Sequence, residues 1–270
     1  MLVFPNAKIN IGLNITEKRL DGFHNLETVF YPINLTDILE FVESKDKTIF
    51  NNTGLKINVS NSDNLVLKAY NLLKEKYKLP ELNIHLHKII PVGAGLGGGS
   101  SDAAFMLTAL NTYFELQISD SDIEKYAQQL GSDCPFFIKN KPIFAEGTGN
   151  IFTTVNLDLS DYYILIVKPD IHISTKEAFT GINPAKSEFN LREISNLPVS
   201  DFKKIITNDF EKTIFKLYPE IKQIKDILYH SGAVYAQMSG SGSSVFGFFR
   251  EKPEIPKEFK IYFTFLQKPK

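Results

Sequence analysis

The chain has 270 residues, of which 43% are hydrophobic and 23% charged, and its formal net charge at pH 7 is −1. This length and composition are typical of a globular protein with one large core or two modest cores. The near-neutral charge, without a long run of Lys or Arg, excludes the basic surface of a nucleic-acid-binding protein. No apolar run approaches the roughly 18 residues of a membrane span, and Met1–Lys8 lacks the pattern of a signal peptide. We therefore expect a cytoplasmic protein.

The first half of the chain predicts short strands followed by a helix. Alternating apolar residues predict strands over 7–15, 26–33 and 37–44. Helical spacing of apolar residues over 65–77 follows the cluster SNSDN, in which Asp63 or Asn64 can act as the N-cap. Residues 82–90, LNIHLHKII, again alternate as a strand. They lead through a glycine-rich loop into an apolar helix over 103–114.

The second half predicts an α+β unit. A helix is expected over 121–130, closed by Gly131, and a hairpin over 141–155 that turns at Gly147–Asn150. Strands are expected over 162–169, 234–240, 245–249 and 260–266, with a short helix near Thr175 and one or two helices over 201–230. The restart of strand character after Asp161 places a boundary near residues 155–160, which gives domains over 1–157 and 158–270.

A glycine-rich loop separates the strand over 82–90 from the helix that follows it. Residues Pro91–Ala104 read PVGAGLGGGSSDAA, with five glycines in seven positions. Glycine lets backbone N–H groups approach a ligand, and a helix N-terminus offers unpaired N–H groups and partial positive charge. The pattern favours a phosphate-binding loop over a flexible linker, because a linker is not enclosed between a strand and an apolar helix. It is neither a Walker A loop nor a dinucleotide fingerprint, since the lysine of the first and the acidic residue of the second are missing.

Two charged residues stand where the sequence leaves alternatives open. Lys8 interrupts an apolar alternation, so it points either to solvent or into a site. Asp133, in GSDCPFF, either caps a helix before Pro135 or presents its carboxylate to a site.

The cysteine and two of the histidines are also candidates for chemistry. Cys134 is the single cysteine, which excludes an internal disulfide, and its apolar surroundings without a nearby His argue against a thiol nucleophile. His85 and His87 alternate on one strand face, but no third ligand accompanies them. We therefore predict no metal site in the protein itself.

Three blocks in chain order resemble the GHMP kinases, the superfamily of galactokinase, homoserine kinase and mevalonate kinase. They read PNAKINIGLNI near the N-terminus, PVGAGLGGGSSDAA in the middle and MSGSGSSVFGFF, Met238–Phe249, near the C-terminus. The resemblance implies an α+β fold with a ribosomal-S5-like N-terminal domain, a ferredoxin-like C-terminal domain and a cleft between them. It also implies a small-molecule kinase that uses ATP and Mg²⁺.

Two further blocks are similar to one branch of that superfamily. They are KRLDGFHNLETVF, Lys18–Phe30, and GSDCPFF, Gly131–Phe137. The branch carries an R-x-D-G-[YF]-H block, which stands here at Arg19–His24. The resemblance implies phosphorylation of the 2-hydroxyl of 4-diphosphocytidyl-2-C-methyl-D-erythritol, a cytidine-diphosphate compound of the non-mevalonate isoprenoid pathway. Two departures are Phe23, where tyrosine is usual, and Asn150, where relatives often have an acid.

The resemblance also implies roles for individual residues. Lys8 would stabilise charge on the transferred phosphoryl group, and Asp133 would act on the acceptor hydroxyl. The ATP phosphates would lie against the residues of the glycine loop, which are Pro91, Val92, Gly93, Ala94, Gly95, Leu96, Gly97, Gly98, Gly99, Ser100 and Ser101. An aromatic clamp for cytosine and polar groups for the rest of the substrate would come from Asn10, Phe23, His24, Thr175, Phe179, Ser239, Gly240 and Ser241.

Other functions remain open from the sequence. A second GHMP small-molecule kinase, such as a homoserine or mevalonate kinase, would share the glycine loop but would have no cytosine to stack on an aromatic side chain. A non-catalytic nucleotide or sugar sensor would tolerate loss of Lys8 or Asp133, and both are present.

Overall fold

The structure is a computed structural model that describes residues 1–57 and 59–269. The chain forms two compact units, each assembled from several segments. The first consists of Met1–Ala7, Asn34–Val92 and Gly97–Lys141, and the second of Lys8–Ile33, Gly93–Leu96 and Pro142–Lys270. The boundary expected between residues 157 and 158 falls inside the second unit, and the division into domains over 1–157 and 158–270 stays a prediction.

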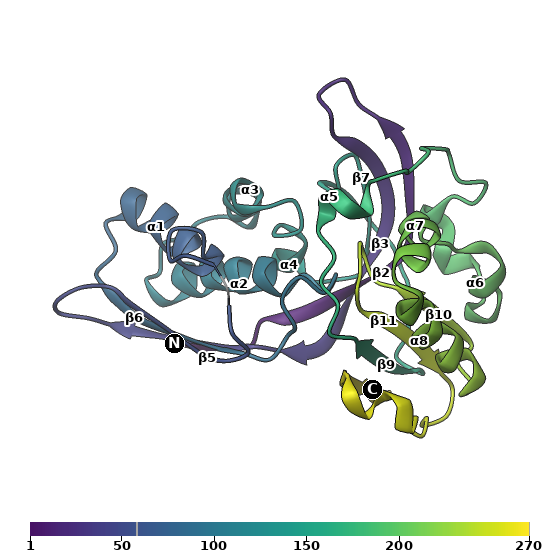
Figure 1. Cartoon of the computed structure of the whole chain (residues 1–270). Helices are drawn as coiled ribbons and strands as arrows, with labels where there is room; N and C mark the ends of the chain where they lie inside the picture. Colours follow the sequence, from purple (N-terminus) through teal and green to yellow (C-terminus); the bar gives the residue numbers. More distant parts are fainter. Residues whose placement is uncertain (58, 270) are drawn as a thin grey trace. The chain divides into compact units, whose positions relative to one another are not determined.

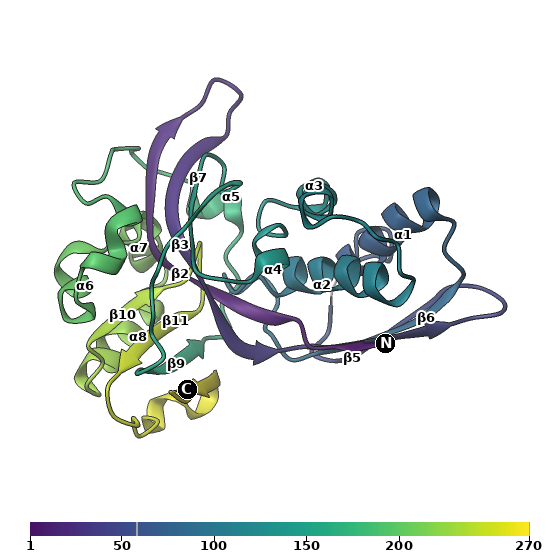
Figure 2. The same cartoon turned by 180° about the vertical axis from the view of Figure 1, so that it is seen from behind.

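The first unit packs helices on one face of a four-stranded sheet, as Figures 1 and 2 both show. The strand order is β1 (Leu2–Val3), β4 (Ile38–Glu43), β6 (Leu82–Lys88) and β5 (Ile49–Gly54), with β5 parallel to β6 and the other pairs antiparallel. The helices are α1 (Leu65–Tyr77), α2 (Gly98–Tyr113), α3 (Asp120–Leu130) and the short α4 (Phe136–Lys139). Apolar residues from β4, β6, α1, α2 and α3 form one buried core.

The second unit contains an antiparallel sheet in the order β10-β11-β9-β12. These strands are β9 (Tyr163–Lys168), β10 (Tyr235–Met238), β11 (Val245–Phe249) and β12 (Phe263–Gln267). The same unit contains the helices α5 (Thr175–Ala178), α6 (Val199–Ile205), α7 (Asp209–Leu217) and α8 (Pro219–His230). It also contains 3₁₀ turns at Leu191–Asn196 and Lys257–Ile261. Figure 1 shows α8 lying along β10 and β11, and their apolar residues share a core.

A third four-stranded sheet runs in the order β2-β3-β7-β8. Its strands are β2 (Asn6–Lys18), β3 (His24–Thr36), β7 (Ile143–Glu146) and β8 (Ile151–Thr154). The first residues of β2 and the last of β3 belong to the first unit, and the rest of this sheet to the second. The loop between β2 and β3, at residues 19–23, forms a projecting hairpin tip in Figure 2.

Most of the predicted elements are confirmed, and the α+β class is correct. The cap of α1 is Asn64, whose Oδ1 accepts hydrogen bonds from the backbone N–H groups of Val66 at 2.9 Å and Leu67 at 3.3 Å. Two predictions were wrong. Helix α2 begins at Gly98 rather than near Ala103, and the described residues 199–230 form three helices instead of one or two. Within the ranges that the structure describes, no helix is both long enough and apolar enough to cross a membrane.

Candidate active site

The glycine loop joins the end of β6 to the start of α2. Gly93, Gly95 and Gly97 have φ values of +63°, +76° and +69°, a backbone region that glycine adopts without strain. Gly97 is the N-cap of α2 and makes no side-chain cap, and the first turn contains no acidic residue. The first N–H groups of α2 therefore keep their donor capacity and the positive end of the helix dipole is not neutralised. This local chemistry fits an anion such as phosphate.

Gly98 lies directly over a lysine side chain of the first unit. A Cβ atom at Gly98 would come within 2.9 Å of Lys88 Nζ and 2.8 Å of Ile90 Cγ2. The start of α2 can approach the end of β6 this closely only because position 98 has no side chain.

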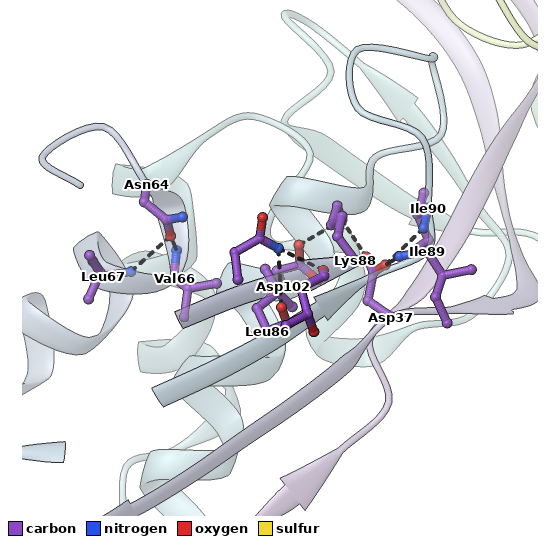
Figure 3. A network of polar contacts seen from close by, with 11 residues as sticks. Asp37, Asn64, Val66, Leu67, Leu86, Lys88, Ile89, Ile90 and Asp102 are labelled. Carbon is purple, nitrogen blue, oxygen red and sulfur yellow. Dashed lines mark hydrogen bonds and ion pairs between the residues drawn. The ribbon is translucent and has the colours of Figure 1, made fainter. Parts of the chain in front are cut away.

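Lys88 belongs to a cluster of three buried charged side chains, which Figure 3 shows. Its Nζ donates to Asp37 Oδ2 and, at 2.8 Å, to Asp102 Oδ2, and the three side chains are 2%, 0% and 3% exposed in the order Lys88, Asp37, Asp102. Burial raises the pKa of Asp102 to about 7, because desolvation of the carboxylate outweighs the attraction of Lys88 and Asp37 adds repulsion. These three residues were not predicted from the sequence.

Asp133 lies in the first unit, in the turn between α3 and α4, and is partly buried. Helix α4 begins at Phe136 with Pro135 in the N-cap position, so Asp133 is not the N-cap residue of this helix. The neighbouring Cys134 is buried, and desolvation, with the charge of Asp133 adding to it, raises the pKa of its thiol to about 11. A thiol with this pKa stays protonated at neutral pH, which supports the argument against a thiol nucleophile.

Lys8 lies in the second unit and is only 3% exposed, so the solvent-facing alternative was wrong. Its Nζ donates to Asn10 Oδ1 at 2.6 Å and to the carbonyl oxygen of Gly95 at 3.3 Å. The same ammonium lies 4.9 Å from the ring centroid of Phe30. A lysine of the N-terminal block is therefore bonded directly to the glycine loop.

Ser239 connects the C-terminal block to the same point. Its Oγ donates to the Gly95 carbonyl oxygen at 2.8 Å and accepts from the backbone N–H of Asn10 at 3.1 Å. Gly240 packs closely on Asn10, since a Cβ atom there would come within 3.2 Å of Asn10 Oδ1. The structure thus brings Lys8, Asn10, Gly95 and Ser239 together around one carbonyl group.

Replacement of Gly95 by alanine tests how tightly this point is packed. A Cβ atom would lie 2.0 Å from the Ser239 carbonyl oxygen, in a residue with φ +76°. Backbone strain and overpacking together predict a loss of about 2–5 kcal/mol in unfolding free energy, measured by urea titration. Gly181→Ala is the matched control, because Gly181 has φ +75° and no atom within 4 Å of its Cβ position. Equal losses in the two variants would contradict tight packing at Gly95.

Three residues that were not predicted from the sequence support this cluster. Thr28 Oγ1 accepts from Asn10 Nδ2 at 3.0 Å, and Gln237 Oε1 accepts from the Gly12 N–H at 2.8 Å. Asn208 Nδ2 donates to the carbonyl oxygens of Met238 and Gly240, both at 2.8 Å, and so holds the Gly/Ser turn. They come from strands and loops distant in sequence, and no motif of their own marks them.

The aromatic residues of the expected clamp lie around the β2–β3 hairpin tip. The rings of His24 and Phe179 are stacked, with centroids 4.7 Å apart and planes at 21°. Phe23 is 64% exposed, and its backbone N–H is held by Asp21 Oδ1 at 3.1 Å, while Arg19 forms an ion pair with Asp21. The pKa of Asp21 is lowered, because the Arg19 side chain and the Phe23 backbone N–H both donate hydrogen bonds to its carboxylate.

Other expected site residues show fewer contacts. Thr175 is exposed at the start of α5 and reaches Phe179 through the backbone, where the Phe179 N–H donates to its carbonyl oxygen at 3.2 Å. Ser241 is partly buried in the turn after Gly240.

His85 and His87 both contact Thr53 Oγ1, at 2.8 and 2.9 Å. In the described residues, no group of three or more His, Cys, Asp or Glu side chains could hold a metal ion.

Comparison with known proteins agrees with these features. Residues 64–141 match the model of the GHMP kinases N terminal domain, and residues 193–260 match GHMP kinases C terminal. The chain is 55% identical over 269 residues to a 4-diphosphocytidyl-2-C-methyl-D-erythritol kinase of Bacteroides fragilis, covering 98% of each chain. It is 54% identical over 262 residues to the kinase of that name from Parabacteroides distasonis, covering 97% of this chain and 96% of the relative.

Solved structures point the same way. A crystal structure of 4-(cytidine 5'-diphospho)-2C-methyl-D-erythritol kinase matches with a TM-score of 0.79 and 29% identity, covering 92% of this chain and 89% of that one. A mevalonate kinase matches with a TM-score of 0.70 at 17% identity, covering 98% of each chain, and shows a shared fold. The chain therefore belongs to the GHMP kinases and, among them, to the 4-diphosphocytidyl-2-C-methyl-D-erythritol kinases.

Proposed function

We propose that this kinase transfers the γ-phosphoryl group of ATP to the 2-hydroxyl of 4-diphosphocytidyl-2-C-methyl-D-erythritol, which yields the 2-phosphate and ADP. The structural observation that carries the proposal is the Gly95 carbonyl oxygen, which accepts from Lys8 Nζ at 3.3 Å and from Ser239 Oγ at 2.8 Å. These hydrogen bonds connect the N-terminal block, the glycine loop and the Gly/Ser turn, the three blocks that the family resemblance assigns to the site. Such positioning is the main requirement of phosphoryl transfer.

The glycine loop is the proposed site of the ATP phosphates. Its backbone and the uncapped N-terminus of α2 offer N–H donors and partial positive charge to an anion. The residues assigned to ATP are Pro91, Val92, Gly93, Ala94, Gly95, Leu96, Gly97, Gly98, Gly99, Ser100 and Ser101. Mg²⁺, when bound, would neutralise charge on the phosphates, and such ions take few protein ligands.

Lys8 and Asp133 are the proposed catalytic residues. In the proposed step, Asp133 accepts the proton of the 2-hydroxyl, and the oxygen forms a bond to the γ-phosphorus. The bond between that phosphorus and the β–γ bridging oxygen breaks, and the electron pair leaves with ADP. The ammonium of Lys8 stabilises the negative charge that spreads over the transferred group, and its burial strengthens this interaction.

The cytidine part of the substrate is assigned to the hairpin tip and α5. Phe23 is exposed at the tip, and its ring can stack on a base. Phe179 forms the other side of the clamp, and His24, stacked on Phe179, would read the base edge. Polar contacts to the rest of the substrate are assigned to Asn10, Thr175, Ser239, Gly240 and Ser241.

Release of ADP with different acceptors tests the proposed function. The cytidyl substrate should support turnover, whereas homoserine, mevalonate and galactose should not, because they have no base for the clamp. Comparable turnover with homoserine or mevalonate would favour another GHMP kinase activity. ADP release with none of the acceptors would favour a nucleotide or sugar sensor.

Phe23→Ala tests the clamp. Loss of one stacked aromatic ring costs about 1–3 kcal/mol, so KM for the cytidyl substrate should rise by roughly 5- to 150-fold. KM for ATP should not change, and both constants are measured by steady-state kinetics. Leu20→Ala is the matched control, since Leu20 is 110% exposed on the same tip. An unchanged KM in the Phe23 variant would remove Phe23 from the clamp.

A further inference from the structure

The buried cluster of Lys88, Asp37 and Asp102 has no place in the proposed chemistry. Each side chain is at most 3% exposed, and both carboxylates bond to the single ammonium. Removing three charges from water is costly, and apolar groups of the same volume often stabilise a protein as well or better. Fold stability alone is therefore a weak reason for this cluster.

The position of the cluster suggests a function for it. Asp37 Oδ1 accepts from the backbone N–H groups of Ile89 at 2.6 Å and Ile90 at 2.8 Å, just after β6, as Figure 3 shows. Lys88, the last residue of β6, bonds to Asp102 in the second turn of α2. The strand that enters the glycine loop and the helix that leaves it are thus fixed to the same three side chains.

The hydrogen bonds also distinguish the two carboxylates. Both oxygens of Asp37 accept hydrogen bonds, from two backbone N–H groups and from Lys88. Asp102 Oδ2 accepts from Lys88, whereas its buried Oδ1 has no partner within the described residues. If both carboxylates were ionised, the cluster would carry a net charge of about −1 behind a phosphate loop, whereas a proton on Asp102 makes it neutral.

The two charged groups that act most strongly on Asp102 come from neighbouring segments. Lys88 comes from β6 and Asp37 from the segment between β3 and β4. The same core contains titratable residues from α1, α3 and the α3–α4 turn. Tyr70 donates to the Pro80 carbonyl oxygen, Tyr126 bonds to Lys76, and the Cys134 thiol, whose pKa is about 11, is uncharged at neutral pH.

We propose that Lys88, Asp37 and Asp102 are positioning residues of the phosphate loop, and that Asp102 holds a proton when nucleotide binds. The proposal rests on the proposed ATP site. The cluster fixes the end of β6 and the start of α2, so that the N–H groups of the loop are preorganised for phosphate. The proton removes a negative charge that would oppose the bound anion.

A dependence of nucleotide affinity on pH follows from this. The raised pKa of Asp102, about 7, means that the group is neutral below that pH and charged above it. Affinity for a polyphosphate should therefore be higher on the acid side and fall as the pH rises through this range. Asp102→Asn stays neutral at every pH and keeps an oxygen acceptor for Lys88.

Calorimetric titration with AMP-PNP, a non-hydrolysable ATP analogue, tests the proton. Dividing the Kd of the wild type by the Kd of Asp102→Asn at each pH cancels the effect of the ligand's own titration. The ratio should rise by at least about fivefold between roughly pH 6 and pH 8.5. Parallel pH profiles for the two proteins would overturn the assignment of the proton to Asp102.

The positioning role is tested separately. Lys88→Met should raise Kd for AMP-PNP by about tenfold or more while KM for the cytidyl substrate stays within about twofold. Because that variant strands two buried carboxylates, Lys88→Met/Asp37→Asn/Asp102→Leu is made as well, which removes all three charges and keeps an oxygen acceptor at position 37 for the Ile89 and Ile90 N–H groups. It should keep a Tm close to the wild type and still bind AMP-PNP weakly. Wild-type affinity in a folded triple variant would overturn the positioning role.

A matched control and a check on the proposed function complete the experiment. Lys74→Met breaks a more exposed ion pair of the same unit, with Glu81 at 2.5 Å, and should leave Kd unchanged. An equal loss of affinity in this control would overturn a specific role for the cluster. If the wild type fails to bind AMP-PNP at all, the proposed ATP site itself is wrong. Binding with the expected variant effects but no kinase turnover would leave the inference standing and refute the catalytic proposal.

Discussion

Asp133→Ala is expected to lower kcat by about 10²- to 10⁴-fold, with little change in KM for ATP. In the proposed mechanism the Asp133 carboxylate orients the acceptor hydroxyl and takes its proton. Loss of a positioned general base lowers kcat by this factor. The phosphate contacts assigned to the glycine loop do not involve this side chain, so nucleotide binding should persist. Steady-state kinetics with both substrates measures the two effects.

The controls for Asp133 separate chemistry from structure. Asp133→Asn keeps the shape of the side chain but removes the base, so it should be almost as slow as the alanine variant. Asp170→Ala removes a fully exposed carboxylate, 3.9 Å from Lys168, and should leave kcat unchanged. Normal turnover in Asp133→Ala would remove Asp133 from the mechanism.

The elements were predictable where a local pattern decides the structure. Alternation identified β2 and β6, a near-continuous apolar run identified β9, and Asp63 or Asn64 before an apolar helical pattern identified the start of α1. The start of α2 was missed because glycine has poor helix propensity, and Gly98 and Gly99 are helical only in their tertiary context. Gly98 illustrates this context, since its missing side chain makes room for Lys88.

The candidate site was predictable in part, and for a related reason. The glycine loop, Lys8 and the Gly/Ser turn could be found because each lies in a recognisable block of sequence. The residues that support the glycine loop could not be found, because Asp37 and Asp102 are 65 positions apart in the sequence. Their side chains meet only at Lys88 in the folded protein. Alternation also failed to orient Lys8, since β2 is buried on both faces over Asn6–Ile15.

Burial of Lys8 leads to the second large prediction, a large loss of activity with only a small loss of stability. Lys8→Met should lower kcat by about 10²- to 10³-fold, because the proposed charge stabilisation of the transferred group is lost. The unfolding free energy should fall by at most about 1–3 kcal/mol, the cost of leaving the buried Asn10 Oδ1 without its bond from Lys8. A buried ammonium is costly to desolvate, methionine has a similar shape, and the Gly95 carbonyl oxygen keeps its bond from Ser239 Oγ. Kinetics and urea titration give the two quantities.

A double variant shows whether Lys8 and Asp133 serve the same step. If both act on one transition state, Lys8→Met/Asp133→Ala should be about as slow as the slower single variant, because catalytic groups that act as a unit are strongly non-additive. Lys168→Met, which removes a partly buried lysine of the second unit, should keep normal turnover. Losses that multiply in the double variant would place the two residues in separate steps. A folded Lys8→Met protein with normal kcat would mean that the buried ammonium only fastens β2 to the loop at Gly95.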